Sequence, residues 1–304
     1  MMDASIRLTG AGRAPFRIWL VAARPRTLPA AIAPVLVGTA LAASQDTFRA
    51  LAFIAALGGS IFIQIGTNLS NDYSDARRGA DAEDRLGPVR VTAAGLVAPR
   101  AVLRAAWLAF GIAVAFGAYL VALTGWQLLI VGAASILVGV LYTGGPRPYG
   151  YEGLGELFVF LFFGLVAVVG SYYVQTEHLR ALAFWLAVPV GLLAAAILIV
   201  NNVRDIDTDR RAGKRTLAVR LGRSRARRLF GASVYLAFLW TAGVAIGAGK
   251  PALLLSWLAL PLAPPLARTV TSHTDGPSLN MALAGTGRLL AAYALLLSAG
   301  LLLS

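Results

Sequence analysis

The sequence has no cysteine among its 304 residues, which excludes disulfide bridges and any chemistry at a thiol. Charge is also scarce, since Asp, Glu, Lys and Arg make up 13% of the chain, whereas soluble proteins carry about 25%. Apolar residues take their place: 58% of the chain is hydrophobic and the mean hydropathy is +0.72. The sequence therefore predicts an integral membrane protein.

Acids are the scarcer charged class, with 14 Asp and Glu against 27 Lys and Arg. In a membrane protein a basic excess is typical of cytoplasmic loops, so we expect no nucleic-acid partner. If the N-terminus is inside, only Arg49, Arg180 and Lys250 fall in outer loops. This asymmetry predicts a multi-pass protein of the cell (inner) membrane, with the N-terminus and active site cytoplasmic and the C-terminus outside.

Apolar runs of about 20 residues, the length that an α-helix needs to cross a bilayer, recur along the whole chain. We expect nine, at 25–43, 49–70, 101–123, 126–143, 154–174, 181–200, 229–248, 251–270 and 282–303. The predicted fold is an all-α membrane protein, a bundle of nine transmembrane helices with cytoplasmic cap loops. We interpret 1–304 as one intramembrane domain whose basic N-terminal segment, 1–24, lies at the membrane interface.

A dense polar cluster follows the apolar run that ends at Val200. If that helix continues, Asn201, Asp205 and Asp209 lie at i, i+4 and i+8 on one face. Two carboxylates and an amide form an oxygen-rich face suited to Mg²⁺, with water and substrate phosphate as its remaining ligands. The bases that follow can bind the rest of a polyanion. They are Arg210, Arg211, Lys214 and Arg215.

A matching cluster ends the second apolar run. Asn71 and Asp75 repeat the Asn-x-x-x-Asp spacing and also precede an Arg-Arg pair, and an adjoining face carries Gln64, Asn68 and Asp72. Ionisable groups beside hydrocarbon are candidates for function. Two facing carboxylate clusters with flanking bases are what a diphosphate bridged by Mg²⁺ requires. The alternative is a solvated positive-inside loop with incidental acids.

The loop from Tyr142 to Tyr149 contains glycine and proline, which end a helix and let backbone approach a ligand. Its only base, Arg147, is a candidate ligand for a diphosphate or a carboxylate. Glu152 and Glu156, one turn apart, either join this site or form a charge pair at a helix N-terminus. If the bound diphosphate carries an allylic tail, its ionisation leaves a carbocation, which the two tyrosines could shield by cation–π contact. Alternatively, the tyrosines belong to an interfacial aromatic belt.

Two motifs carry a family resemblance. The segment 71–81, Asn-Asp-Tyr-Ser-Asp-Ala-Arg-Arg-Gly-Ala-Asp, with Gly-Pro-Val-Arg at 87–90, resembles the first aspartate motif of the UbiA superfamily of intramembrane prenyltransferases. The segment 205–217 resembles the second motif, and the likeness covers almost the whole chain. Within the superfamily, both motifs look like those of the MenA subfamily, the 1,4-dihydroxy-2-naphthoate polyprenyltransferases. Gly79 departs from many first motifs, which have a further Asp there, and Asp81 is expected to replace it.

The resemblance implies Mg²⁺ as cofactor, membrane lipid as surroundings, and a polyprenyl diphosphate and an aromatic acceptor as substrates. The polyprenyl group would pass to 1,4-dihydroxy-2-naphthoate with decarboxylation, giving demethylmenaquinone in menaquinone biosynthesis. By matched position, the implied catalytic residues are Asn71, Asp75, Asp205 and Asp209, and Asp81 joins these four as a metal ligand. The implied substrate ligands are Asn68, Asp72, Arg77, Arg90, Tyr142, Arg147, Asn201, Arg204, Lys214 and Arg215.

Three other functions compete with this one. Another superfamily member would prenylate 4-hydroxybenzoate, homogentisate, haem or a chlorophyll precursor. A CDP-alcohol phosphotransferase would require a closely spaced run of aspartates, which this sequence lacks because its two clusters are far apart along the chain. A membrane transporter for cations would place charges near the middle of several helices, whereas these acids fall at helix ends.

Overall fold

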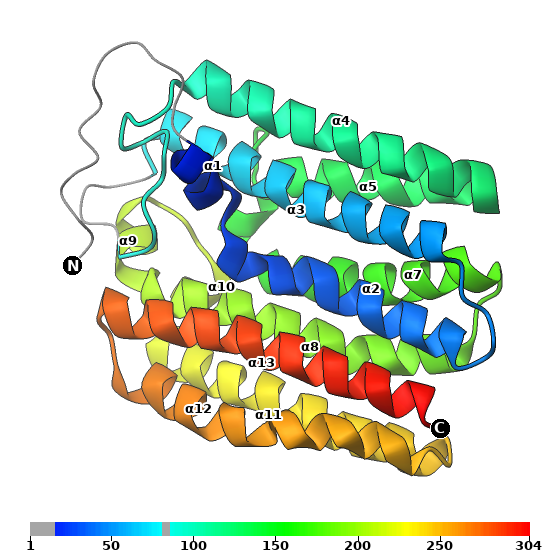
Figure 1. The fold of residues 1–304 in the computed structure, drawn as a ribbon. Coiled ribbons are helices and arrows are strands. Elements are labelled where there is room, and N and C mark those ends of the chain that lie inside the picture. The colour runs from blue at the N-terminus through cyan, green and yellow to red at the C-terminus, as the bar shows by residue number, and fades with distance from the viewer. Residues whose placement is uncertain (1–15, 81–85) are drawn as a thin grey trace.

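The computed structural model describes residues 16–80 and 86–304, which form helices and loops without any strand (Figure 1). The helices lie side by side as a bundle, and α1, α9 and α10 gather at one end of it. The elements are α1 (Phe16–Ala23), η1 (Pro25–Thr27), α2 (Leu28–Ala43), α3 (Ala50–Arg77), α4 (Pro99–Thr124), α5 (Gln127–Leu141), η2 (Tyr149–Glu152), α6 (Gly155–Val159), η3 (Phe160–Val166), α7 (Ala167–Thr176), α8 (Ala181–Arg204), α9 (Ile206–Arg211), α10 (Leu217–Leu221), α11 (Arg223–Gly247), η4 (Pro251–Leu262), α12 (Ala263–Ser272) and α13 (Gly276–Leu302).

Eight helical segments of the described chain are long and apolar enough to cross a membrane. The protein is therefore a multi-pass membrane protein. The fourth predicted span corresponds to α5, which has 15 residues and is about 22 Å long, against a hydrocarbon core of about 30 Å. The count of nine spans thus stays a prediction, and so does the interfacial position of 1–24, much of which lies outside the described residues.

The core of the bundle forms where small residues let helices approach closely. Helix α8 contacts α11, α13 and η3, and α2 contacts α13 and α7. Gly164 of η3 and Gly191 of α8 meet backbone to backbone, because a Cβ added to Gly164 would lie 2.7 Å from the Cα of Gly191. η3 itself is a π-helical stretch, a form that often marks functional sites.

The loop between α3 and α4 folds back over the bundle end where α1 lies. Its segment 86–98 buries Val91 and Val97 in a small apolar cluster with α1, α3 and α4. The side chain of Asp72 on α3 accepts hydrogen bonds from the backbone N–H groups of Val91 and Thr92, both at 3.0 Å. This loop is therefore attached to α3 through both apolar and polar contacts.

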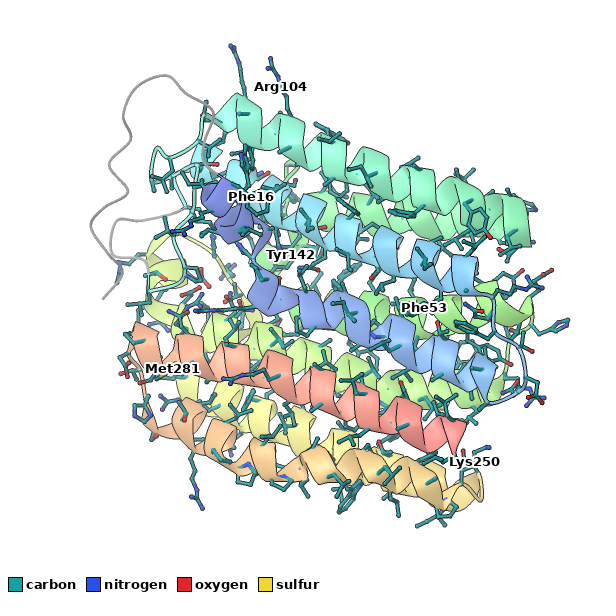
Figure 2. The ribbon with its side chains drawn as sticks, in the orientation of Figure 1. Phe16, Phe53, Arg104, Tyr142, Lys250 and Met281 are labelled. Carbon is teal, nitrogen blue, oxygen red and sulfur yellow. The ribbon has the colours of Figure 1, made fainter. Side chains whose placement is uncertain are left out.

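At the opposite end of the bundle, the turn between α2 and α3 is fastened to α7. Gln175, which is fully buried, accepts a hydrogen bond from the backbone N–H of Arg49 at 2.6 Å and donates one to the carbonyl of Arg49 at 3.3 Å. Tyr172 donates to Gln45 in the same turn at 2.9 Å. Lys250 lies at this end beside the C-terminus, whereas Arg104 projects near the other end (Figure 2).

Candidate active site

A cavity of about 710 Å³ extends between the helices from α3, α4 and α5 to α7 and α8. Most of its wall is apolar, with side chains such as Ile63, Val121 and Phe162. Charged and amide side chains line one end only, which we call the polar end. They are Asn68, Asn71, Asp75, Arg90, Asn201, Asn202, Asp205, Asp209 and Lys214, together with Arg24 and Gln64.

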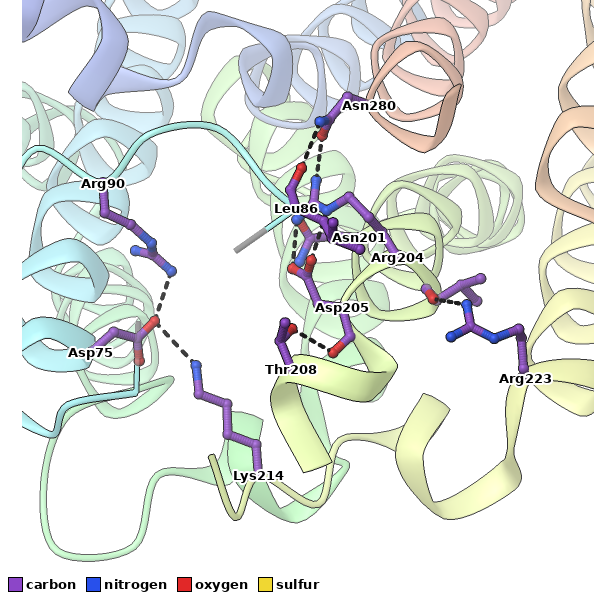
Figure 3. A network of polar contacts seen from close by, with 11 residues as sticks. Asp75, Leu86, Arg90, Asn201, Arg204, Asp205, Thr208, Lys214, Arg223 and Asn280 are labelled. Atoms are coloured by element: carbon purple, nitrogen blue, oxygen red, sulfur yellow. Dashed lines mark hydrogen bonds and ion pairs between the residues drawn. The ribbon is translucent and has the colours of Figure 1, made fainter. Parts of the chain in front are cut away.

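Asp75 lies at the centre of the polar end and is 1% exposed. Its carboxylate accepts a hydrogen bond from Arg90 at 2.7 Å, lies 3.5 Å from the ammonium of Lys214, and accepts a hydrogen bond from the Tyr151 hydroxyl at 2.6 Å. Figure 3 shows Arg90 and Lys214 reaching Asp75 from opposite sides. The last turn of α3 thus gathers the α3–α4 loop, η2 and the segment after α9 around one carboxylate.

Tyr151 is a site residue that the sequence did not reveal. Burial raises the pKa of its phenol, and the neighbouring Asp75 carboxylate raises that pKa further. The hydroxyl therefore keeps its proton and donates a hydrogen bond to Asp75. The ring also lies under the ammonium of Lys214, 4.8 Å from the ring centroid. Tyr151 therefore positions an acid and a base at once, and the aromatic-rich loop around Tyr149 was its only sequence signal.

The second acidic cluster departs slightly from the continuous helix that the spacing predicts. Helix α8 ends at Arg204, and Asp205 joins it to α9 with a non-helical ψ of 7°. The i+4 spacing nevertheless survives, because the N–H of Asp205 donates to the carbonyl of Asn201 and that of Asp209 donates to the carbonyl of Asp205. All three side chains line the cavity.

Arg204 is 1% exposed and is not in the cavity lining. Its guanidinium donates to both carboxylate oxygens of Asp205, at 2.8 and 2.5 Å, and to the side-chain oxygen of Asn201 at 2.8 Å. It also donates to Asn280 on α13 at 2.7 Å, and Asn280 donates to the carbonyl of Leu86 at 2.9 Å (Figure 3). Arg204 thus links the second cluster to α13 and to the α3–α4 loop, and in this arrangement it orients Asp205.

The remaining residues of the first cluster have distinct contacts. Asn71 accepts a hydrogen bond from the Thr143 hydroxyl at 2.8 Å, which ties α3 to the end of α5. Asn68 donates to the carbonyl of Ala23 at 2.9 Å and to Thr27 at 3.1 Å. Asp72, by contrast, is committed to the two backbone groups of the α3–α4 loop and is not in the cavity lining.

Besides Asp72 and Arg204, three more predicted substrate ligands lie outside the cavity lining. Arg77 is exposed and packs over the ring of Tyr73 at 5.8 Å, while Arg147 and Arg215 are exposed in loops. Tyr142 does line the cavity. Asp81, the fifth predicted metal ligand, falls outside the described residues.

The donor set at the polar end fits Mg²⁺ only as a partner of a phosphate. No group of three or more His, Cys, Asp or Glu side chains in the described part of the chain is arranged to hold a metal by itself. The cavity nevertheless offers the carboxylates of Asp75, Asp205 and Asp209 and the amides of Asn71 and Asn201, all oxygen donors. Mg²⁺ typically takes one or two protein carboxylates and completes its octahedron with water and substrate phosphate.

Comparisons with known proteins indicate the family of this chain. The profile of a family described as the UbiA prenyltransferase family matches residues 31–281. A protein of Mycobacterium tuberculosis named 1,4-dihydroxy-2-naphthoate octaprenyltransferase is 42% identical over 291 residues, covering 95% of this chain and 98% of that protein. A Bacillus subtilis protein of the same name is 35% identical and covers 92% and 91%.

A similar fold occurs among solved structures. The structure described as a UbiA homolog from Archaeoglobus fulgidus bound to GPP and Mg²⁺ superposes with a TM-score of 0.69 at 16% identity. The match covers 94% of this chain and all of the archaeal one. At this identity the likeness concerns the arrangement of the helices.

Proposed function

Because the chain belongs to the UbiA prenyltransferase family, we propose that it transfers a polyprenyl group from a polyprenyl diphosphate to 1,4-dihydroxy-2-naphthoate. The acceptor loses its carboxylate in the reaction, which gives demethylmenaquinone for menaquinone biosynthesis. The observation that carries this proposal is the identity of 42% over 95% of the chain to a relative named for that acceptor. The cavity, charged at one end and apolar along its length, supports it.

The diphosphate is assigned to the polar end, between the two acidic clusters. Asp75, Asp205, Asp209 and Asn71 would hold Mg²⁺ with the diphosphate oxygens, and bound Mg²⁺ would neutralise charge on the leaving diphosphate. Lys214 and other cavity-lining bases supply further positive charge close to the same place. Arg90 and Lys214 both pair with Asp75, so a bound diphosphate would give them a second anionic partner.

The polyprenyl tail is assigned to the apolar length of the cavity. Burial there keeps water away from the allylic carbon while its bond to the diphosphate oxygen breaks. The ring carbon of the acceptor that bears the carboxylate then forms the new carbon–carbon bond, and carbon dioxide leaves with the electron pair returning to the ring. Tyr142 and Tyr149 line the wall beside the polar end, where their ring faces can stabilise positive charge on the allylic group.

We further propose the cell membrane as the location, with the polar end facing the cytoplasm. The bases support this orientation, because Arg49 and Lys250 lie at the end opposite the cavity's charged groups. The whole of 1–304 is proposed to act as one domain, with its basic N-terminal segment at the interface.

The test is an assay of the purified protein in detergent with a polyprenyl diphosphate, Mg²⁺ and two acceptors in parallel. Prenylated naphthoquinol and released carbon dioxide are expected from 1,4-dihydroxy-2-naphthoate, and EDTA should abolish both until Mg²⁺ is restored. Product from 4-hydroxybenzoate alone would overturn the assigned acceptor while leaving the family assignment intact. Turnover that resists the chelator would contradict the role of the acidic clusters.

A further inference from the structure

Glu156 on α6 is a buried acid that the diphosphate site does not use. The residue is 7% exposed, and its Oε1 accepts a hydrogen bond from the Asn202 side-chain nitrogen at 2.9 Å. Its Oε2 is buried and has no hydrogen-bond partner among the described residues. Glu152, one turn earlier, is instead exposed and paired with Arg220 at 2.8 Å.

A buried carboxyl group with one unsatisfied oxygen is costly, since a single hydrogen bond does not replace the water that it loses. Two apolar side chains would join α6 to α8 at lower cost. A buried polar group of this kind therefore calls for an explanation beyond helix packing. The explanation lies in its one partner, because Asn202 lines the cavity.

The wall around Asn202 suits a flat aromatic ligand. Tyr142, Tyr149 and Phe158 line the same cavity, with ring centroids 5.5 Å apart for the two tyrosines and 4.3 Å apart for Tyr149 and Phe158. Gly155 leaves room for this arrangement, because a Cβ there would lie 3.1 Å from the Tyr142 ring. Asn202 also directly follows Asn201 on α8 and lies three residues before Asp205, so this wall adjoins the diphosphate site.

We propose that Glu156 is a positioning residue for the aromatic acceptor and acts through Asn202. By holding the amide nitrogen of Asn202, Glu156 directs the amide oxygen of Asn202 to the cavity, where it accepts a hydrogen bond from a ring hydroxyl of the acceptor. The tyrosines and Phe158 hold the ring face. This inference rests on the proposed function, because it requires a hydroxylated aromatic substrate.

The experiment measures steady-state kinetics of Glu156→Leu, Glu156→Gln and Asn202→Leu in purified protein, with Glu152→Gln as the matched control. Glu156→Leu should raise the KM for 1,4-dihydroxy-2-naphthoate about tenfold, the equivalent of one hydrogen bond at 1.4 kcal/mol per factor of ten. The KM for the polyprenyl diphosphate should stay unchanged. Glu156→Gln should retain a near-normal KM, because its amide oxygen can still accept from Asn202.

A second measurement isolates the hydroxyl contact. The compound 2-naphthoate lacks both ring hydroxyls, so its inhibition constant against the acceptor should be the same in the unmodified protein and in Glu156→Leu. The Glu156→Leu/Asn202→Leu double variant should be no worse than either single variant, since both remove the same contact.

Three outcomes would overturn the inference. If Glu156→Leu raised the KM for the acceptor and the KM for the polyprenyl diphosphate equally, the contact between Glu156 and Asn202 would serve only to join α6 to α8. A Glu156→Gln variant as impaired as Glu156→Leu would show that the carboxyl acts by its proton and not by position. Weaker binding of 2-naphthoate to Glu156→Leu would mean that the pair shapes the ring wall and contacts no hydroxyl. If the unmodified protein prenylates no naphthoate at all, the proposed function fails instead, and these comparisons separate the two failures.

Discussion

Asp75→Asn tests whether Asp75 is the counter-ion that stabilises Arg90 and Lys214 at the polar end. The change keeps the size of the side chain but removes the negative charge that faces Arg90 and Lys214, whose side chains are 8% and 9% exposed. Breaking a buried ion pair by removing one partner costs about 3–5 kcal/mol, because the remaining charge stays buried and unpaired. Since the Asp75 side chain is 1% exposed, solvent screening reduces this little. We expect the free energy of unfolding to fall by about 3 kcal/mol or more.

The same variant should respond unusually to inorganic pyrophosphate. Pyrophosphate can replace the missing carboxylate, so without Mg²⁺ it should raise the unfolding temperature of Asp75→Asn more than that of the unmodified protein. The measurement is thermal unfolding in detergent with and without pyrophosphate, alongside prenyl-transfer activity, which should be lost.

Asp72→Asn is the matched control for this comparison. Asp72 is similarly buried on the same helix, but its carboxylate accepts hydrogen bonds from the backbone N–H groups of Val91 and Thr92. We expect this variant to be destabilised without any added benefit from pyrophosphate. If Asp75→Asn unfolds at the same temperature as the unmodified protein, the role of Asp75 as counter-ion is refuted. Equal pyrophosphate effects in both variants would refute the replacement of the carboxylate by pyrophosphate.

Tyr151→Phe should lower kcat/KM about tenfold through loss of one hydrogen bond to the charged Asp75. Because burial and Asp75 raise the pKa of Tyr151, its hydroxyl stays protonated, so the defect should be the same throughout an activity profile from about pH 6 to 9; a defect confined to low pH would contradict this. Arg77→Gln should keep turnover within about twofold, because Arg77 is exposed and outside the cavity lining, and surface substitutions usually have small effects; a large rise in the KM for the diphosphate would restore it as a ligand. Asn280→Ala should speed hydrogen exchange in the backbone of 86–92, because it removes the bond from α13 to that loop and a partner of Arg204; unchanged exchange would show that apolar contacts alone hold the loop.

The membrane fold could largely be predicted from the sequence because apolar length is a strong signal. The run that ends at Val200 corresponds to α8, and the final run corresponds to α13. The ends were harder to place: α13 begins at Gly276, several residues before the predicted 282, because Asp275 caps it by accepting from the N–H of Ser278 at 2.8 Å. The short α5 shows the limit of counting apolar residues, since length alone does not establish a crossing.

The site residues could be predicted where helical spacing governs them. The i+4 pattern of Asn71 and Asp75 does place both in one cavity lining. The same geometry argues against Arg77, which lies two residues beyond Asp75 and therefore on nearly the opposite face of α3. Because each residue of an α-helix turns the chain by about 100°, Asp75 and Arg77 point to different sides of α3.

Other contacts depend on tertiary structure that no local pattern reveals. Arg204 looked like a substrate ligand, but Asn280, 76 residues later, and the adjacent Asp205 occupy its guanidinium. Tyr151 reaches Asp75 from η2, 76 residues later in the chain. Asp207 pairs with Arg223 on α11, 16 residues later, at 2.6 Å.

The two hydrogen bonds between the Gln175 side chain and the backbone of Arg49 bear on whether the protein could transport a substrate across the membrane. A carrier that works by alternating access opens its central site first to one side and then to the other. Opening the end of the bundle opposite the polar end would leave the buried side-chain amide of Gln175 without its hydrogen-bond partners. It would also break the hydrogen bond between Tyr172 and Gln45. We therefore expect the bundle to open at its polar end only. The anionic group of the donor would then enter and leave from the same face of the bilayer, and the protein would not transport it across.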